Sequence, residues 1–171
     1  LGAMFTFHQP FALELGMTHV RSFFVAYAIA AVVLRVVFGH LIDRAGRRRV
    51  VIVTLALYVV AVAGMSALQP GWLALFGAGL GIAHGLFYPA YNALALEGMG
   101  QHERGKSMAL FQAGFNAVSS CGALVLGELA ERAGYPAVFW AAGGCVLLAL
   151  VIVLVSPEGR SSGTSRKAAA P

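Results

Sequence analysis

The sequence predicts an all-α polytopic membrane protein. Of its 171 residues, 59% are hydrophobic and only 11% are charged, whereas a soluble domain has about 25% charged residues. A bilayer core about 30 Å thick requires roughly 20 apolar helical residues to cross it. Five stretches have this length and composition, and we place them at residues 20–42, 50–68, 72–95, 107–129 and 137–155.

The opening stretch is too short to be a sixth span. Residues 1–13 read LGAMFTFHQPFAL, and a helix of this length reaches only about 20 Å at 1.5 Å per residue. We therefore interpret it as the end of a truncated helix. His8 and Gln9 on this piece are weak candidates for lining a cavity.

Basic residues predict the orientation in the membrane. The loop at 43–49, the loop near 97–106 and the tail lie on one side of the alternating spans and carry nine of the twelve Lys and Arg residues. Since basic loops stay inside the cell, we expect a multi-pass protein of the cell membrane with a cytoplasmic carboxy terminus. Residues 1–156 form the transmembrane part, and the small, polar and basic tail 157–171 is predicted to be disordered. The basic clusters are short and lack interleaved aromatic residues, so no nucleic-acid partner is expected.

Two segments of the sequence are similar to each other. GHLIDRAGRRRV at 39–50 and GELAERAGYPAV at 127–138 share Gly, Leu, an acid, Arg, Ala, Gly and Val at a constant offset of 88 residues. Each segment lies between two apolar runs. The chain is therefore predicted to contain two three-helix units of opposite orientation, as in secondary transporters.

The first of these segments resembles a known transporter motif. Gly39, Asp43, Arg44, Gly46 and the arginines 47–49 lie between two spans in an arrangement similar to motif A of the major facilitator superfamily. Residues 85–112 also resemble that family's tenth helix, the loop after it and the start of its eleventh helix. The resemblance covers residues 1–156. It implies that the chain is the carboxy-terminal half of a major facilitator superfamily fold, from late helix seven to helix twelve. This half would be built as a three-plus-three inverted repeat.

The residue types of the motif have physical reasons. A glycine at position 39 permits close helix packing, and Gly46 permits a tight reversal of the chain. The resemblance implies that Asp43 makes a charge and dipole contact with a helix of the missing amino-terminal half, and that this contact holds one face closed. Arg47, Arg48 and Arg49 either anchor the loop at lipid headgroups or serve only as topogenic charges.

Polar residues within the spans are candidates for a substrate cavity. His84, Tyr88 and Asn92 recur every four residues and therefore share one helix face. Gln112 and Asn116 share a face of the next span in the same way. For all five, the alternative is hydrogen bonding between helices.

Two further features concern helix contacts and charge. Gly77, Gly81 and Gly85 form a stripe of small residues that predicts close packing on a neighbouring helix. Arg35 lies within a span and is the sixth cavity candidate, although it could instead extend its side chain to the membrane surface or make a structural contact.

We therefore expect secondary active transport of a small organic solute by alternating access, including proton-coupled efflux. The alternative is a non-transporting membrane scaffold or regulatory subunit. An enzyme is not expected, because the sequence offers no paired nucleophile and base and no metal cluster, and no cofactor or metal is predicted. The expected partners are a small-molecule substrate, protons as a candidate coupling ion, the missing amino-terminal half and the lipid bilayer. Since no span has a central Asp or Glu, a coupling carboxylate is expected in the missing half, with His84 as a substitute.

Overall fold

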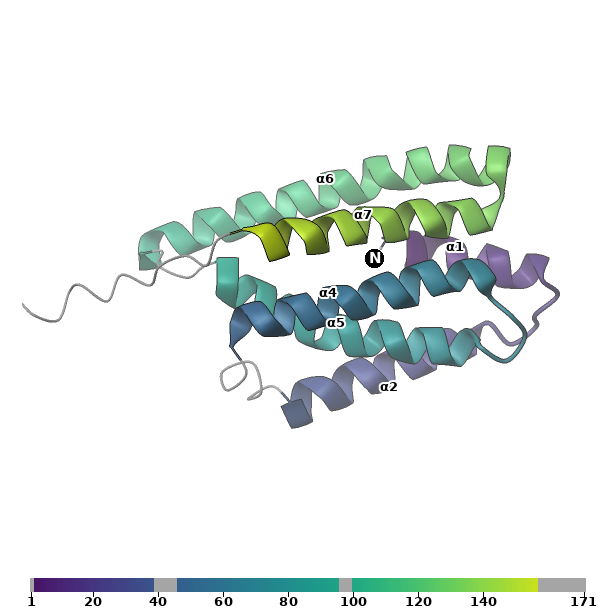
Figure 1. The fold of residues 1–171 in the computed structure, drawn as a ribbon, viewed down its shortest axis with the longest axis horizontal. Helices are drawn as coiled ribbons and strands as arrows, with labels where there is room; N and C mark the ends of the chain where they lie inside the picture. The colour runs from purple at the N-terminus through teal and green to yellow at the C-terminus, as the bar shows by residue number, and fades with distance from the viewer. Residues whose placement is uncertain (1, 39–45, 96–99, 157–171) are drawn as a thin grey trace, which may run out of the picture.

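A computed structural model describes residues 2–38, 46–95 and 100–156 of the chain. These residues form helices joined by short connections and contain no strand (Figure 1). The helices are α1 (Gly2–Glu14), α2 (Arg21–Phe38), α4 (Arg47–Gly64), the 3₁₀ helix η1 (Met65–Ala67), α5 (Leu73–Ala95), α6 (Gln101–Ala133) and α7 (Tyr135–Val155). The predicted tail 157–171 lies outside the described residues.

Four candidate membrane spans are present within the described residues. They are Arg47–Ala67, Leu73–Ala93, Glu103–Ala133 and Tyr135–Val155, and they correspond to four of the five predicted spans. The fifth prediction, 20–42, corresponds to the 18-residue helix α2, which is about 27 Å long at 1.5 Å per residue. Its predicted end beyond residue 38 lies outside the part of the chain that the structure describes.

Helix α6 is longer than predicted. It has 33 residues and is therefore about 50 Å long, so it exceeds the roughly 30 Å of a bilayer core. The prediction of a loop up to residue 106 is wrong, because the helix already begins at Gln101. At the other end, Arg132 Nε donates a hydrogen bond of 2.6 Å to Glu128, and such a pair four residues apart supports a helix in water.

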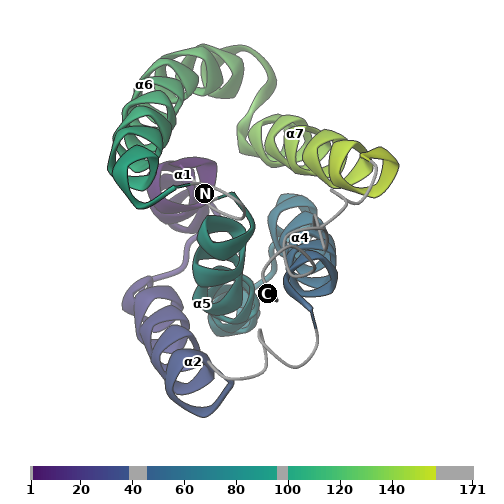
Figure 2. The same cartoon turned by 90° about the vertical axis from the view of Figure 1, so that its left-hand side faces the viewer.

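Helix α5 lies between α2 and α4, and α4 in turn packs against α7 (Figure 2). Helix α6 packs against α7, and the short α1 contacts both α6 and α7.

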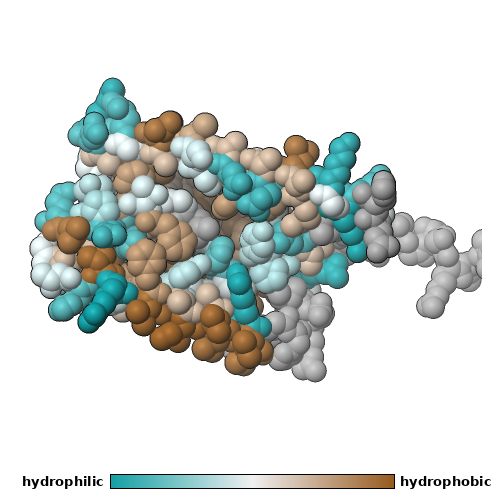
Figure 3. Space-filling view, turned by 180° about the vertical axis from the view of Figure 1, so that it is seen from behind, coloured by the Kyte–Doolittle hydropathy of each residue, from teal (hydrophilic) through white to brown (hydrophobic). Residues whose placement is uncertain are grey.

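The exposed surface of α2 is strongly apolar and forms a brown band along the lower edge of Figure 3. Its exposed large hydrophobic residues are Phe24, Val25, Ile29, Val32, Val33, Val36 and Val37. A surface of this kind is suited to contact with lipid tails or with other membrane helices.

The predicted glycine stripe brings α5 into contact with the backbone of α2. A Cβ atom on Gly77 would lie 2.3 Å from the carbonyl oxygen of Phe23, and one on Gly81 would lie 2.4 Å from that of Tyr27. At Gly85 the nearest atom would be the carbonyl oxygen of Ala31, at 3.1 Å. The prediction of close packing is therefore confirmed, because no side chain fits between the two helices at Gly77 and Gly81.

The two similar sequence segments share a backbone feature. Gly46 precedes α4 with a φ of 85°, and Gly134 precedes α7 with a φ of 79°. These two glycines occupy the same position in the segments that begin at residues 39 and 127. Since other L-residues rarely adopt a positive φ, both glycines are required for the sharp entry into the helix that follows.

His8 is part of the packing around α1. Its side chain is fully buried, its ring stacks on Phe23 at a centroid distance of 4.1 Å, and its Nδ1 hydrogen-bonds to the carbonyl oxygen of Met4 at 2.6 Å. The suggestion that His8 lines a cavity is therefore wrong. Gln9, the next residue, is exposed, because helix geometry turns consecutive side chains by about 100°.

Candidate functional site

The polar residues predicted on α5 lie at three successive turns of that helix. His84, Tyr88 and Asn92 are all half-buried. The rings of His84 and Tyr88 are neighbours, with centroids 6.2 Å apart. Pro89 lies inside the helix and removes one backbone donor there. The structure thus places a polar face, defined by His84, Tyr88 and Asn92, along the second half of α5.

His84 makes a hydrogen bond between helices. Its Nδ1 lies 2.7 Å from the hydroxyl of Tyr58 on α4, and the Tyr58 side chain is buried. On the other side, the ring of Tyr27 on α2 has its centroid 6.0 Å from that of His84. His84 therefore joins α5 to both neighbouring helices through side-chain contacts.

Tyr58 is a site residue that sequence reasoning missed. None of the predicted cavity residues came from the span 50–68, which is almost entirely apolar. A single tyrosine in an otherwise aliphatic run was the signal that could have identified it, because a buried tyrosine hydroxyl usually has a hydrogen-bond partner.

A second polar cluster connects α5 to α6. The hydroxyl of Tyr88 donates to Gln112 Oε1 at 3.4 Å, and Gln112 Nε2 donates to Asn116 Oδ1 at 3.1 Å. The bond between Gln112 and Asn116 confirms that these two residues share a face of α6. Both amides are exposed, so their remaining hydrogen-bonding groups are accessible to a ligand.

Asn92 has an unsatisfied acceptor. Its Oδ1 is buried and has no hydrogen-bond partner, and among the described residues only His8 Nε2 shares this property. A buried acceptor without a partner costs about 1–3 kcal/mol. Such an atom is suited to accept a hydrogen bond from a bound solute or water.

Arg35 belongs to the same region as His84. Arg35 follows Tyr27 by eight residues on α2, about two helical turns, and its side chain is exposed. No acidic side chain in the described ranges forms an ion pair with it. Arg35 thus shares helix α2 with Tyr27, which contacts His84, whereas Gln112 and Asn116 gather around Tyr88.

The motif residues are described only in part. Gly39, Asp43 and Arg44 lie outside the described residues, so their predicted contacts stay predictions. Gly46 makes the predicted reversal, with its positive φ of 85°. Arg48 is not solely a topogenic charge, because its Nη2 lies 2.9 Å from the carbonyl oxygen of Val153, 3.1 Å from that of Leu154 and 2.9 Å from that of Ser156.

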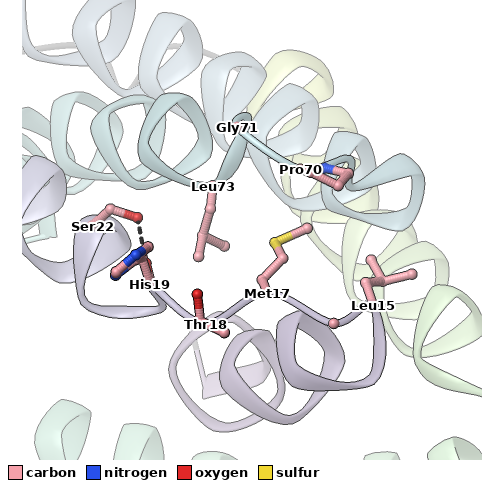
Figure 4. Close-up of a pocket in the computed structure, with 9 residues that line it drawn as sticks. Leu15, Met17, Thr18, His19, Ser22, Pro70, Gly71 and Leu73 are labelled. Carbon is pink, nitrogen blue, oxygen red and sulfur yellow. Dashed lines mark hydrogen bonds between the residues drawn. The ribbon is translucent and has the colours of Figure 1, made fainter.

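A separate cavity of about 330 Å³ lies between the α1–α2 and α4–α5 connections (Figure 4). None of the predicted site residues lines it. Its walls are mainly apolar. Ser22 Oγ donates to the backbone carbonyl oxygen of His19 at 2.9 Å at the start of α2. Its lining residues are Leu15, Gly16, Met17, Thr18, His19, Ser22, Pro70, Gly71 and Leu73.

Comparison with known proteins shows that the chain matches one protein family. A family model described as the Major Facilitator Superfamily matches residues 2–171. The chain is also 30% identical over 131 residues to uncharacterized MFS-type transporters of Mycobacterium tuberculosis, one from strain CDC 1551 / Oshkosh and one from strain ATCC 25618 / H37Rv. Each match covers 75% of this chain and 31% of the relative. The aligned part of the chain thus spans about a third of the length of these curated relatives.

Proposed function

Since the chain belongs to the major facilitator superfamily, a family of transporters and not of enzymes, we propose that it forms the carboxy-terminal half of a secondary active transporter. This half would run from late helix seven to helix twelve. The complete protein would move a small organic solute across the cell membrane by alternating access, with the cavity between the two halves.

The repeated segments support the assignment to one half of the fold, and the resemblance of residues 85–112 to the family's tenth helix and the loop after it supports the carboxy-terminal half. The segment that resembles motif A leads into α4, and a similar segment leads into α7 with the same positive-φ glycine. This pairing relates α2 to α6 and α4 to α7, which is the pattern of an inverted repeat. Helix α1 would then be the counterpart of α5.

The single observation that carries the pathway assignment is the accessible polar cluster on α5 and α6. Tyr88, Gln112 and Asn116 are joined by hydrogen bonds, and the two amides are exposed on a helix rich in exposed apolar residues. Amide groups that face lipid would be costly. They are therefore best explained if this face of α6 borders an aqueous cavity that receives the substrate.

Transport itself is tested by reconstitution. The complete transporter is purified and screened against a compound library for solutes that raise its unfolding temperature, because a ligand that binds the folded state stabilises it. Compounds found in this way are then tested for flux in proteoliposomes, with and without a proton gradient. Specific binding without any flux would favour a regulatory subunit over a transporter.

We expect the double substitution Gln112→Ala and Asn116→Ala to weaken substrate binding about tenfold, since each lost hydrogen bond is worth about 0.5–1.5 kcal/mol. Folded yield should change little, because both side chains are exposed. Substrate affinity is measured by equilibrium binding. The control is Val118→Ala, an exposed apolar position on the same helix. Equal affinity in the double variant and the control would contradict the pathway assignment.

Asp43→Asn should lower transport while leaving membrane insertion intact. The substitution removes the charge that the family resemblance assigns to a closing contact, whereas the neighbouring basic residues that set topology remain. Flux in proteoliposomes and the yield of membrane-inserted protein are measured together. A variant that transports at the parental rate would exclude this role for Asp43.

A further inference from the structure

A row of aromatic rings runs from α4 across α5 to α6. Tyr58 lies edge-on to Phe87 with ring centroids 5.6 Å apart, and Phe87 stacks on Tyr91 at 5.5 Å. Tyr91 contacts Phe111 on α6 at 5.0 Å, and the ring of Phe111 is 6.4 Å from that of Phe115. We call these five residues the aromatic row.

The aromatic row is buried at one end and exposed at the other. The side chain of Tyr58 is 6% exposed, the three rings in the middle are half-buried, and Phe115 is 40% exposed. Aromatic rings prefer offset-stacked or edge-to-face neighbours. The exposed end of the row therefore offers surface on which one further ring can stack.

Two amide side chains lie beside this exposed end. Gln112 and Asn116, which we call the amide pair, each follow a phenylalanine of the row by one residue. At 100° per residue, Phe111, Phe115 and the amide pair lie within about 140° of the helix surface. Phe111 and Gln112 both contact tyrosines of α5, so this face of α6 is turned toward α5.

The amide pair retains hydrogen-bond donors. Gln112 Nε2 uses one of its two hydrogens for Asn116 Oδ1, and Asn116 Nδ2 donates to no side chain or carbonyl of the described residues. Since an amide nitrogen carries two hydrogens, one remains on Gln112 and two remain on Asn116. A carbonyl oxygen attached to an aromatic ring is complementary to this arrangement.

The surroundings of the amide pair disfavour a charged ligand. Residues 73–95 of α5 and residues 107–127 of α6 contain no Asp, Glu, Lys or Arg. Lys106 precedes Gln112 by six residues, which is about 9 Å along the helix axis. An ion at the amide pair would lose its hydration without gaining an opposite charge. A neutral solute avoids this cost.

We propose that the exposed end of the aromatic row and the amide pair together bind the planar aromatic part of a neutral solute that bears a carbonyl group. The ring would stack on Phe115, and the carbonyl oxygen would accept hydrogen bonds from the amide pair. Small-molecule sites commonly combine aromatic walls with a few such polar groups. This inference rests on the proposed function, because it names the class of solute that the pathway on α5 and α6 receives.

The test compares the binding of matched probes to the complete transporter in lipid nanodiscs, with empty nanodiscs subtracted. We expect naphthalene carboxamide to bind about fivefold more tightly than its saturated analogue decalin carboxamide, because only the planar ring stacks on Phe115. Naphthalene carboxylate and naphthylmethylammonium should bind about tenfold more weakly than the carboxamide. Absence of specific carboxamide binding, or equal affinity for either ion, would overturn the proposal.

The preference for the aromatic over the saturated carboxamide is then measured in variants. Phe115→Leu should reduce this preference to near one, whereas Phe115→Tyr keeps a ring and should retain it. The control is Trp140→Leu, because Trp140 is an exposed aromatic residue on α7 outside the aromatic row. A general loss of stability would not change the ratio of two affinities. Parental preference in Phe115→Leu would contradict the stacking role, and Phe115→Met replaces that variant if it is not obtained folded.

The role of the amide pair has its own readout. Gln112→Ala combined with Asn116→Ala should remove the advantage of naphthalene carboxamide over methylnaphthalene, which cannot accept a hydrogen bond from an amide. An unchanged advantage would overturn the carbonyl contact.

Failure of this inference and failure of the proposed function give different results. Flux of a solute that naphthalene carboxamide does not inhibit would overturn the solute class and leave transport established. Carboxamide binding that depends on Phe115, in a protein that carries no solute, would support the binding site and count against transport.

Discussion

Replacement of Gly81 by alanine is expected to destabilise the protein by about 1–3 kcal/mol, the range for overpacking a close-packed interior. The new methyl group would lie 2.4 Å from the carbonyl oxygen of Tyr27 and 2.9 Å from the Cβ of Ala30. Because one of these atoms belongs to the backbone, α2 and α5 would have to separate. The midpoint of thermal unfolding in detergent and the monodisperse yield are the measurements.

Gly79 provides a matched control on the same helix. A Cβ atom there would lie 3.7 Å from the Cβ of Ala61, which is an ordinary van der Waals distance. Since alanine is a better helix former than glycine by about 1 kcal/mol, Gly79→Ala should be neutral or stabilising. If Gly81→Ala unfolds at the same temperature as Gly79→Ala, the close approach of α5 to α2 is incorrect.

Replacement of His84 by alanine is expected to destabilise the protein by about 1–3 kcal/mol, the cost of an unsatisfied buried polar group. The buried hydroxyl of Tyr58 would lose its partner, 2.7 Å away. A double-mutant cycle with Tyr58→Phe should give a coupling energy of up to about 1.7 kcal/mol, as found for hydrogen bonds between membrane helices.

Tyr88→Phe is the control for this cycle, because Tyr88 also neighbours His84 but its hydroxyl makes only a long hydrogen bond of 3.4 Å, to Gln112. Its effect on stability should be small. The pathway role of His84 is tested separately with cysteine at position 84. Modification by aqueous thiol reagents, with protection by substrate, together with zero coupling to Tyr58, would assign His84 to the pathway instead of to helix packing.

The helices were largely predictable because their signal is local. Apolar runs long enough to cross a bilayer identified α4, α5 and α7 to within a few residues. The error at the start of α6 has a physical cause. Residues 101–106 are polar, and hydropathy alone cannot distinguish a loop from a helix that extends into water.

The residues that share a helix face at the candidate site were also predictable, but their contacts on neighbouring helices were not. A spacing of four residues placed His84 with Tyr88, and Gln112 with Asn116, on common faces. The contact between His84 and Tyr58 depends on how α4 is rotated against α5, which neither helix encodes by itself. For the same reason, the sequence suggested that all three arginines 47–49 were equivalent, whereas the structure shows Arg48 in contact with the carbonyl oxygens of Val153, Leu154 and Ser156 at the end of α7.

By itself the sequence determined the membrane class, the order of the spans, the repeated segment and the glycine stripe on α5. Each of these depends on residue type and short-range periodicity, and bilayer thickness and helix geometry are the same for every protein. Only the tertiary structure decided that the stripe faces the backbone of α2, that Tyr58 pairs with His84, and that Arg48 caps a helix more than 100 residues further along the chain. Such contacts are set by the distance and rotation between packed helices, and these depend on the side chains of both helices at once.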